Sequence, residues 1–184
     1  MLQLARFQKN NADMLNAAER CIELRQHLPS LVLIYSHIDT LAWSGSKKLG
    51  CDIRTTFEAW VTRWLLPHLK SHAPQITATD VYGARCGVLH TLTSKSGLSA
   101  KGYAREIAYG WGTGRAEILQ AVIDGSVVRG QLVVLQYQEL LKCLRLAVED
   151  FVESAAKDTE LTRELIAADA KHYMNIPIPP SGAP

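Results

Sequence analysis

One stretch near the N-terminus limits the fold more than any other, because it is apolar on nearly every side. Residues 30–43 distribute apolar side chains around the whole circumference of a predicted helix, namely Leu31, Val32, Leu33, Ile34, Ile38, Leu41 and Ala42. Since such a helix has no solvent-facing side, other elements must surround it. The sequence therefore predicts a bundle with this helix at its centre.

Helical spacing of apolar residues continues on both sides of the central helix. The repeat of about 3.6 residues is clearest over 132–156, and strand-like alternation is nearly absent. The other predicted helices are 10–28, 53–66, a motif helix that begins near residue 80, 115–123 and 159–171. Residues 103–111 fit either a short strand or a helical turn. We expect an all-α fold, an up-and-down helical bundle with additional C-terminal helices.

Length and composition indicate an ordinary globular chain. The 184 residues, with 47% hydrophobic and 21% charged content, fit one domain with a sizeable core. We place that domain at residues 1–174 and expect a Pro-rich tail, extended or disordered, at 175–184. The scattered cysteines contain no Cys-x-x-Cys pair, the start lacks the apolar core of a signal peptide, and no apolar run could span a bilayer. These features favour a cytoplasmic location.

The segment 77–97 carries the most informative polar residues. Thr77 and Asp80 have the spacing of a capping box, which predicts a helix start. On that helix Arg85 projects into the apolar face, and His90 lies about 140° around the axis from it. Their side chains would not converge on a straight helix. Gly87 lies between them and could let the helix bend, or a symmetric homodimer could supply a shared cleft.

A buried guanidinium needs either an oppositely charged partner or a water-filled cleft. Asp39, at the edge of the central helix, is the candidate partner of Arg85. The neighbourhood of the motif is locally basic: the segment from Arg85 to Arg115 holds five basic residues and one acid. In contrast, the segment 149–169 holds seven acids and two bases.

The Arg85–His90 spacing, near a helix end and before a polar loop, resembles the motif of the HEPN superfamily, in which Arg is followed after four to six residues by His. The resemblance covers the motif and, loosely, the helices of residues 10–155. It implies a helical, metal-independent endoribonuclease that needs no cofactor, forms a homodimer and has RNA as substrate. It also implies an antitoxin-type protein partner, such as a small nucleotidyltransferase.

The resemblance gives the two motif residues catalytic roles. His90 would take the proton from a 2′-hydroxyl or protonate the leaving oxygen. Arg85 would stabilise the charge that builds on the phosphate oxygens. The expected products are a 2′,3′-cyclic phosphate and a 5′-hydroxyl. For substrate binding we single out four residues, with three cations to hold phosphates and an aromatic ring to stack a base: Lys95, Lys101, Arg105 and Tyr82.

A second interpretation stays open, in which the chain is a non-catalytic helical module that binds a nucleotide or a protein partner. Arg85 would then be structural through its ion pair with Asp39, and Cys86 would mark a lost active site, since many active HEPN members carry a polar residue there. Two other patterns are weak: His68 and His72 lack further metal ligands, and the glycines of 110–114 fit no nucleotide-binding fingerprint.

Overall fold

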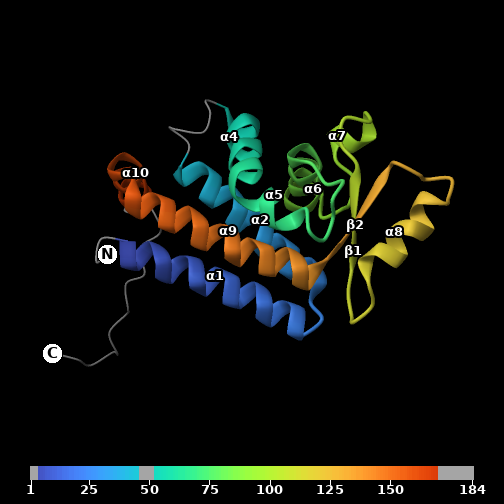
Figure 1. The fold of residues 1–184 in the computed structure, drawn as a ribbon, viewed down its shortest axis with the longest axis horizontal. Helices are drawn as coiled ribbons and strands as arrows, with labels where there is room; N and C mark the ends of the chain where they lie inside the picture. Colours follow the sequence, from blue (N-terminus) through green and yellow to red (C-terminus); the bar gives the residue numbers. More distant parts are fainter. Residues whose placement is uncertain (1–3, 46–51, 170–184) are drawn as a thin grey trace, which may run out of the picture.

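The computed structural model describes residues 4–45 and 52–169, and Figure 1 shows their arrangement. The chain forms helices α1 (Ala5–Glu23), α2 (His27–Ser44), α4 (Ile53–Trp60), η2 (Val61–Leu65), α5 (Leu66–Leu69), α6 (Ala78–Thr91) and α7 (Gly97–Ala100), followed by strand β1 (Glu106–Gly110), helix α8 (Ala116–Asp124), strand β2 (Leu132–Gln136) and helices α9 (Tyr137–Lys157) and α10 (Thr159–Asp169). The order is mostly helical, with a βαβ unit inserted before the last two helices.

The central position of α2 is confirmed. This helix packs against α1, α4, α6, α9 and α10. Its side chains are buried around much of the circumference, including Ile34, Tyr35, Ile38 and Leu41, which are at most 1% exposed. In Figure 1 the long helices α1 and α9 run beside one another along the bundle. The wide distribution of apolar side chains, which the sequence shows directly, therefore accounts for the position of α2.

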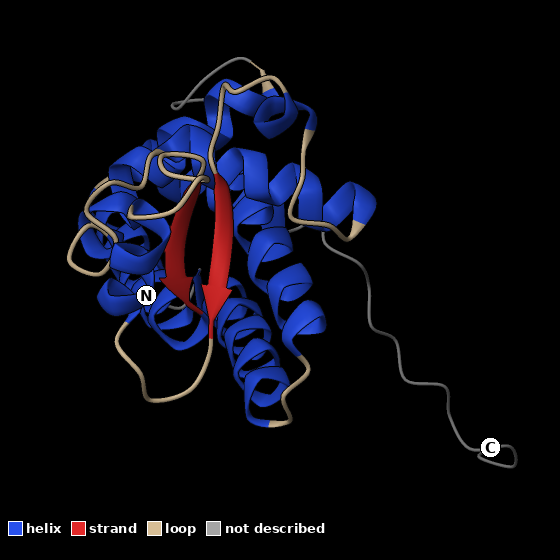
Figure 2. Ribbon diagram, turned by 90° about the vertical axis from the view of Figure 1, so that its right-hand side faces the viewer, coloured by secondary structure: helices blue, strands red, loops and turns tan. Residues whose placement is uncertain are grey.

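The prediction of a purely helical fold is wrong in one region. Strands β1 and β2 form a two-stranded parallel sheet, with Glu106 opposite Leu132 and Gly110 opposite Gln136. Figure 2 shows the two strands side by side and pointing the same way, with helices around them. Because parallel strands need a crossover, α8 connects them, and it lies at the outer edge of the molecule in Figure 1. The region 103–111, left open by the sequence, contains the first of these strands.

The second strand replaces the start of the predicted helix 132–156. Leu132 to Gln136 is a short apolar run with two valines, and periodicity alone does not distinguish such a run from a buried helix. Val133, Val134 and Leu135 are all buried, so the strand is covered on both faces. The helix itself begins only at Tyr137 and continues to Lys157.

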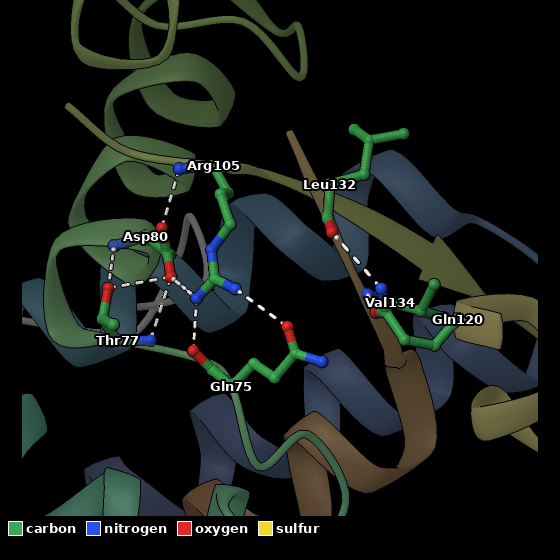
Figure 3. A network of polar contacts seen from close by, with 7 residues as sticks. All are labelled: Gln75, Thr77, Asp80, Arg105, Gln120, Leu132 and Val134. Carbon is green, nitrogen blue, oxygen red and sulfur yellow. Dashed lines mark hydrogen bonds and ion pairs between the residues drawn. The ribbon is translucent and has the colours of Figure 1, made fainter. Parts of the chain in front are cut away.

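One side chain covers the open edge of this small sheet. The amide of Gln120, on α8, accepts a hydrogen bond of 2.7 Å from the backbone N–H of Val134 and donates one of 3.5 Å to the carbonyl of Leu132. Figure 3 shows this amide beside the strand. An unpaired strand edge leaves backbone groups without partners. The Gln120 amide makes two of the hydrogen bonds that a third strand would otherwise make.

The predicted helix 53–66 is interrupted by a π-helical turn. The segment α4 passes into η2 and then α5 without a break in the chain, and Pro67 lies at the start of α5. The ring of Trp60 is fully buried and meets Phe151 of α9 edge-on, as does that of Trp64. A π-turn changes which side chains face the bundle, and here both indoles lie against the same ring.

The remaining boundaries differ by a few residues from the predicted ones. The first helix begins at Ala5 and ends at Glu23, and the last begins at Thr159 and is described as far as Asp169. The predicted tail 175–184 lies outside the described residues. Within the described ranges, every helix is too short or too polar to cross a membrane.

Candidate functional site

The helix that carries the motif begins as the sequence predicts. Thr77 is the N-cap of α6, and Thr77 and Asp80 form the reciprocal capping box, each side chain hydrogen-bonding the other residue's backbone N–H. Val81 and Val88 on the same helix are buried in the core. The capped first turn and this apolar face fix the orientation in which α6 presents Arg85.

The guanidinium of Arg85 makes a two-point ion pair with Asp39 of α2. Nε and Nη2 of Arg85 donate to the two carboxylate oxygens at 3.1 and 2.8 Å. The Arg85 side chain is 11% exposed and that of Asp39 is 34% exposed. Burial alone would lower the pKa of Arg85, but the hydrogen bonds and charge of Asp39 outweigh it and raise that pKa. The partner proposed from the sequence is therefore the partner in the structure.

Arg85 and His90 meet within one chain. Nη1 of Arg85 lies 3.0 Å from Nε2 of His90. Because a guanidinium can only donate, this contact is a hydrogen bond when Nε2 of His90 is the acceptor. The expectation that the two would not converge without a bend or a dimer is wrong, because the long arginine side chain spans the angle between them. His90 is exposed in the last turn of α6.

Gly87 has a different role from the predicted bend. The helix continues through it, and the chain beyond α6 folds back over this glycine: the backbone N–H of Thr93 donates to its carbonyl at 3.2 Å. A β-carbon at residue 87 would lie 2.6 Å from the Thr93 carbonyl oxygen. Leu92 reverses the chain in the left-handed region at φ 54°. Gly87 therefore leaves room for the loop after His90.

Tyr82 lies beside the motif, and its ring already contacts other side chains. Its ring meets Phe57 edge-on with centroids 5.4 Å apart. The guanidinium carbons of Arg85 and Arg54 each lie 5.9 Å from the centre of the same ring. Burial raises the pKa of the Tyr82 hydroxyl, and the neighbouring Cys86 thiol raises it further. The ring thus contacts the core on one side and two cations elsewhere.

Arg54 is a residue near the site that sequence reasoning did not single out. It lies in the first turn of α4, its side chain is 44% exposed, and its Nε donates to Glu58 at 2.9 Å. The nearness of α4 to α6 is a tertiary fact, and nothing in the spacing of 53–66 indicates it. The only sequence feature that pointed to Arg54 was its place on the outer side of a predicted amphipathic helix.

The three predicted phosphate-binding cations are in different situations. Lys95 and Lys101 are exposed in the segment after α6. Arg105 instead turns onto Asp80, with Nη2 2.6 Å from a carboxylate oxygen, and onto the backbone carbonyl of Gln75. Figure 3 shows the guanidinium between these two partners. Arg105 joins the start of α6 to the start of β1, so most of its donors already have partners.

His68 and His72, whose spacing gave only a weak indication of a metal site, have partners on α9. His68 lies 2.8 Å from Asp150, and His72 lies 3.1 Å from Glu139. These contacts attach α5 and the turn after it to α9. Among residues 4–45 and 52–169, no group of three or more side chains is arranged to hold a metal ion.

Comparison of the chain with models of known protein families, with curated proteins and with solved structures gave no significant match. The functional argument therefore depends on the chemistry of Asp39, Arg85 and His90. This group combines a fixed cation with an exposed imidazole whose Nε2 lies 3.0 Å from it. Such a pair can bind a phosphate and exchange a proton beside it.

Proposed function

We propose that this protein is a metal-independent endoribonuclease that cuts RNA by attack of the 2′-hydroxyl, leaving a 2′,3′-cyclic phosphate and a 5′-hydroxyl. The observation that carries the proposal is the 3.0 Å contact between Arg85 and His90, which puts a cation and a proton acceptor at one place on the surface. The resemblance to the HEPN superfamily supports the same assignment. The nucleophile belongs to the substrate, so the reaction needs only charge stabilisation and proton transfer.

The hydrogen bonds of Arg85 suit it to hold a phosphate. A guanidinium has five N–H donors. Two of them bind Asp39 and one faces His90. The other two are on the terminal nitrogens, and the side chain of Cys86 is a further partner of the guanidinium. Two donors side by side match two phosphate oxygens. Asp39 positions this fork, and its charge keeps the guanidinium from rotating away.

His90 performs the proton transfer in this proposal. Its Nε2 lies beside Arg85 in the free protein. On binding of RNA the exposed imidazole would turn from the fixed guanidinium toward the 2′-hydroxyl and accept its proton. Imidazole groups in general are suited to this role because they gain and lose a proton near neutral pH. Arg54, Lys95 and Lys101 would hold the neighbouring phosphates, and Tyr82 would offer the open part of its ring to a base.

The setting of the activity belongs to the same proposal. We place the enzyme in the cytoplasm as a homodimer, with an antitoxin-type protein as its partner, by analogy with the HEPN superfamily. Because Arg85 and His90 meet within one chain, a two-fold would serve to form a groove for RNA rather than to complete the pair.

A second function has one observation in its favour. Arg85 is 11% exposed and makes a two-point pair with Asp39, as expected of an arginine that joins α2 to α6. In this alternative the protein is a non-catalytic module that binds a nucleotide or a protein. Removal of Arg85 would then destabilise it by about 2 kcal/mol, between the values for exposed and buried pairs, since Asp39 keeps some access to water.

The decisive experiment incubates the purified protein with a structured and a single-stranded RNA in EDTA and analyses the fragment ends. We expect cleavage with cyclic phosphate ends by the wild type, and loss of at least about 100-fold in His90→Ala. His68→Ala is the matched control, because His68 lies on α5 and contacts Asp150. Arg85→Lys keeps the charge but loses the fork, so we expect a large loss of cleavage there as well.

Folding is measured beside activity in each variant. His90→Ala should melt as the wild type does, because His90 is exposed. If neither RNA is cut, or if His90→Ala cuts as well as His68→Ala, the nuclease proposal is wrong. A loss of stability in Arg85→Ala combined with wild-type behaviour in His90→Ala in every assay would support the non-catalytic alternative.

A further inference from the structure

The segment 111–130, which contains α8, gathers exposed apolar side chains. Within residues 4–45 and 52–169, five of the twelve large hydrophobic residues that are exposed lie in this one segment. They are Trp111, Ile118, Leu119, Val122 and Val127, with exposed fractions from 44% to 98%. Single exposed apolar residues are ordinary on a protein surface, whereas a group of them marks an interaction site.

Helix α8 is attached to the rest of the molecule on one side only. On that side Gln120 binds strand β2, and the helix lies at the outer edge of the molecule in Figure 1. The opposite side carries Ile118, Leu119 and Val122, because residues one and four positions apart share a side of a helix. None of the nine residues of α8 is buried. Since so short a helix is marginal by itself, a cover on the outward side would stabilise it.

The charges of the segment do not suit a strongly charged partner. Arg115 and Arg129 balance Glu117 and Asp124, so residues 111–130 carry no net charge. A nucleic acid or an anionic membrane surface is bound through an excess of cations. A surface that is apolar and electrically balanced can instead pair with itself, as a two-fold interface requires.

Two of these charges lie at the ends of α8 that its own dipole disfavours. Arg115 is the N-cap residue, at the positive end, and Asp124 is the last residue, at the negative end. Within the chain Arg115 contacts Glu117 at 3.5 Å, with both side chains largely exposed, and Asp124 accepts a hydrogen bond from Gln120 at 3.0 Å. If a second α8 packs antiparallel on the first, each of the two charges lies beside the helix end that favours it.

The size of the segment fits a reversible contact between two copies. Interfaces of standard size use about 20–30 residues a side. The segment 111–130 reaches the lower limit of that range, and the side of α8 that faces β2 cannot take part. The contact is therefore smaller than a standard interface, which is typical of dimers that dissociate on dilution.

We propose that α8 is a dimerisation helix, on which a second copy of this chain places its own α8 antiparallel about a two-fold axis. Ile118, Leu119 and Val122 of the two copies would cover one another at the centre of the contact. The homodimer proposed above by analogy had no assigned interface. This assignment rests on exposure and charge, and it holds whether or not the protein cuts RNA.

The test is sedimentation velocity of the full chain, without RNA, from about 1 to 300 µM. We expect a reversible equilibrium between monomer and dimer. Ile118→Glu and Val122→Glu should each raise the dissociation constant at least about 30-fold, because a charge would be buried at the centre of the contact. Ile53→Glu is the matched control and should dimerise as the wild type does, since Ile53 is 71% exposed on α4 and Ile118 is 63% exposed on α8.

Arg115→Glu tests the antiparallel arrangement. A glutamate at the N-cap suits the dipole of its own helix, but in the dimer it would lie at the negative end of the other α8. The dimer should therefore weaken about threefold, although the monomer folds as before. A dimer that becomes tighter in this variant would contradict the antiparallel pairing.

Two further results would overturn the proposal. One is a wild type that stays monomeric throughout the concentration range, and the other is a dimer that Ile118→Glu and Ile53→Glu form equally well. Vesicles of phosphatidylserine test the rival occupant: a monomer that sediments with them, and no longer does so as Ile118→Glu, would assign this surface to a membrane. Circular dichroism melting of each variant separates loss of the dimer from loss of the fold, and RNA cleavage is measured independently.

Discussion

The carboxylate of Asp80 is the most connected polar group beside the candidate site, and its removal gives a sharp test of the structure. Asp80 is 2% exposed. It accepts hydrogen bonds from the backbone N–H and the hydroxyl of Thr77 at 3.0 and 2.8 Å. It also accepts from the backbone N–H and the guanidinium of Arg105 at 2.7 and 2.6 Å. The substitution Asp80→Ala would leave all of these donors without their acceptor.

The expected loss follows from two contributions. Breaking a buried ion pair from one side costs about 3–5 kcal/mol, and the lower end applies because the Arg105 side chain is 21% exposed. Loss of a capping interaction adds about 1 kcal/mol. We therefore expect Asp80→Ala to lower the free energy of unfolding by about 4 kcal/mol.

The assay is urea denaturation followed by circular dichroism at pH 7. Asp52→Ala is the control, since Asp52 caps α4 through Thr55 but is itself exposed, and it should cost clearly less. In the double variant Asp80→Ala/Arg105→Met, the second change should cost little beyond the first. A loss below about 1 kcal/mol in Asp80→Ala would refute the reasoning, because the pair would then behave like an exposed one.

The same carboxylate gives a pH dependence with a defined sign. Burial would raise the pKa of Asp80, but the hydrogen bonds from Arg105 and Thr77 outweigh it and lower that pKa. A lowered pKa in the folded state stabilises the protein above the ordinary aspartate pKa of about 3.9, and the stabilisation is lost as the pH falls through the folded value. Urea midpoints from pH 7 to pH 2 should fall less steeply below pH 4 in Asp80→Ala than in the wild type.

Two further predictions concern the surroundings of the motif. Gly87→Ala should destabilise by about 1–2 kcal/mol in thermal unfolding, because the steric cost at the Thr93 carbonyl exceeds the helix preference of alanine. Gly97→Ala is the control and should not destabilise, because a β-carbon there would meet none of the described residues. Equal melting temperatures of the two variants would contradict the close approach at Gly87. Gln120→Leu should destabilise by about 1–3 kcal/mol and speed hydrogen exchange at the amide of Val134, and unchanged protection at that amide would show that Gln120 does not cover the strand edge.

The bundle and the ion pair of the site were predictable from the sequence for physical reasons. An all-round apolar helix has only one place in a bundle, so the central position of α2 could be inferred from its residues. A charged residue on an apolar face needs a counter-charge, so Asp39 could be named as the partner of Arg85. The capping box at Thr77 is a local pattern, and local patterns are the part of a fold that the sequence shows most directly.

The errors share a cause, which is that tertiary contacts decided them. The strand at 132–136 forms because residues 106–110 are there to pair with it, and no local feature separates it from the helix after it. The reach of the Arg85 side chain to His90 depends on rotamers that spacing does not encode. The commitment of Arg105 to Asp80, and the nearness of Arg54 to Tyr82, are likewise products of how distant segments meet.

The pairing of β1 with β2 has a consequence for the order in which the chain acquires its shape during synthesis. The partner of β1 is not complete until Gln136 has been made, whereas the helical hairpin of α1 and α2 is available from the start. Arg105 links β1 to the first turn of α6. A nascent chain that ends before Gln136 has no finished sheet to which that turn can be attached. The link from the first turn of α6 to a finished sheet is therefore complete only after residue 136 has been made.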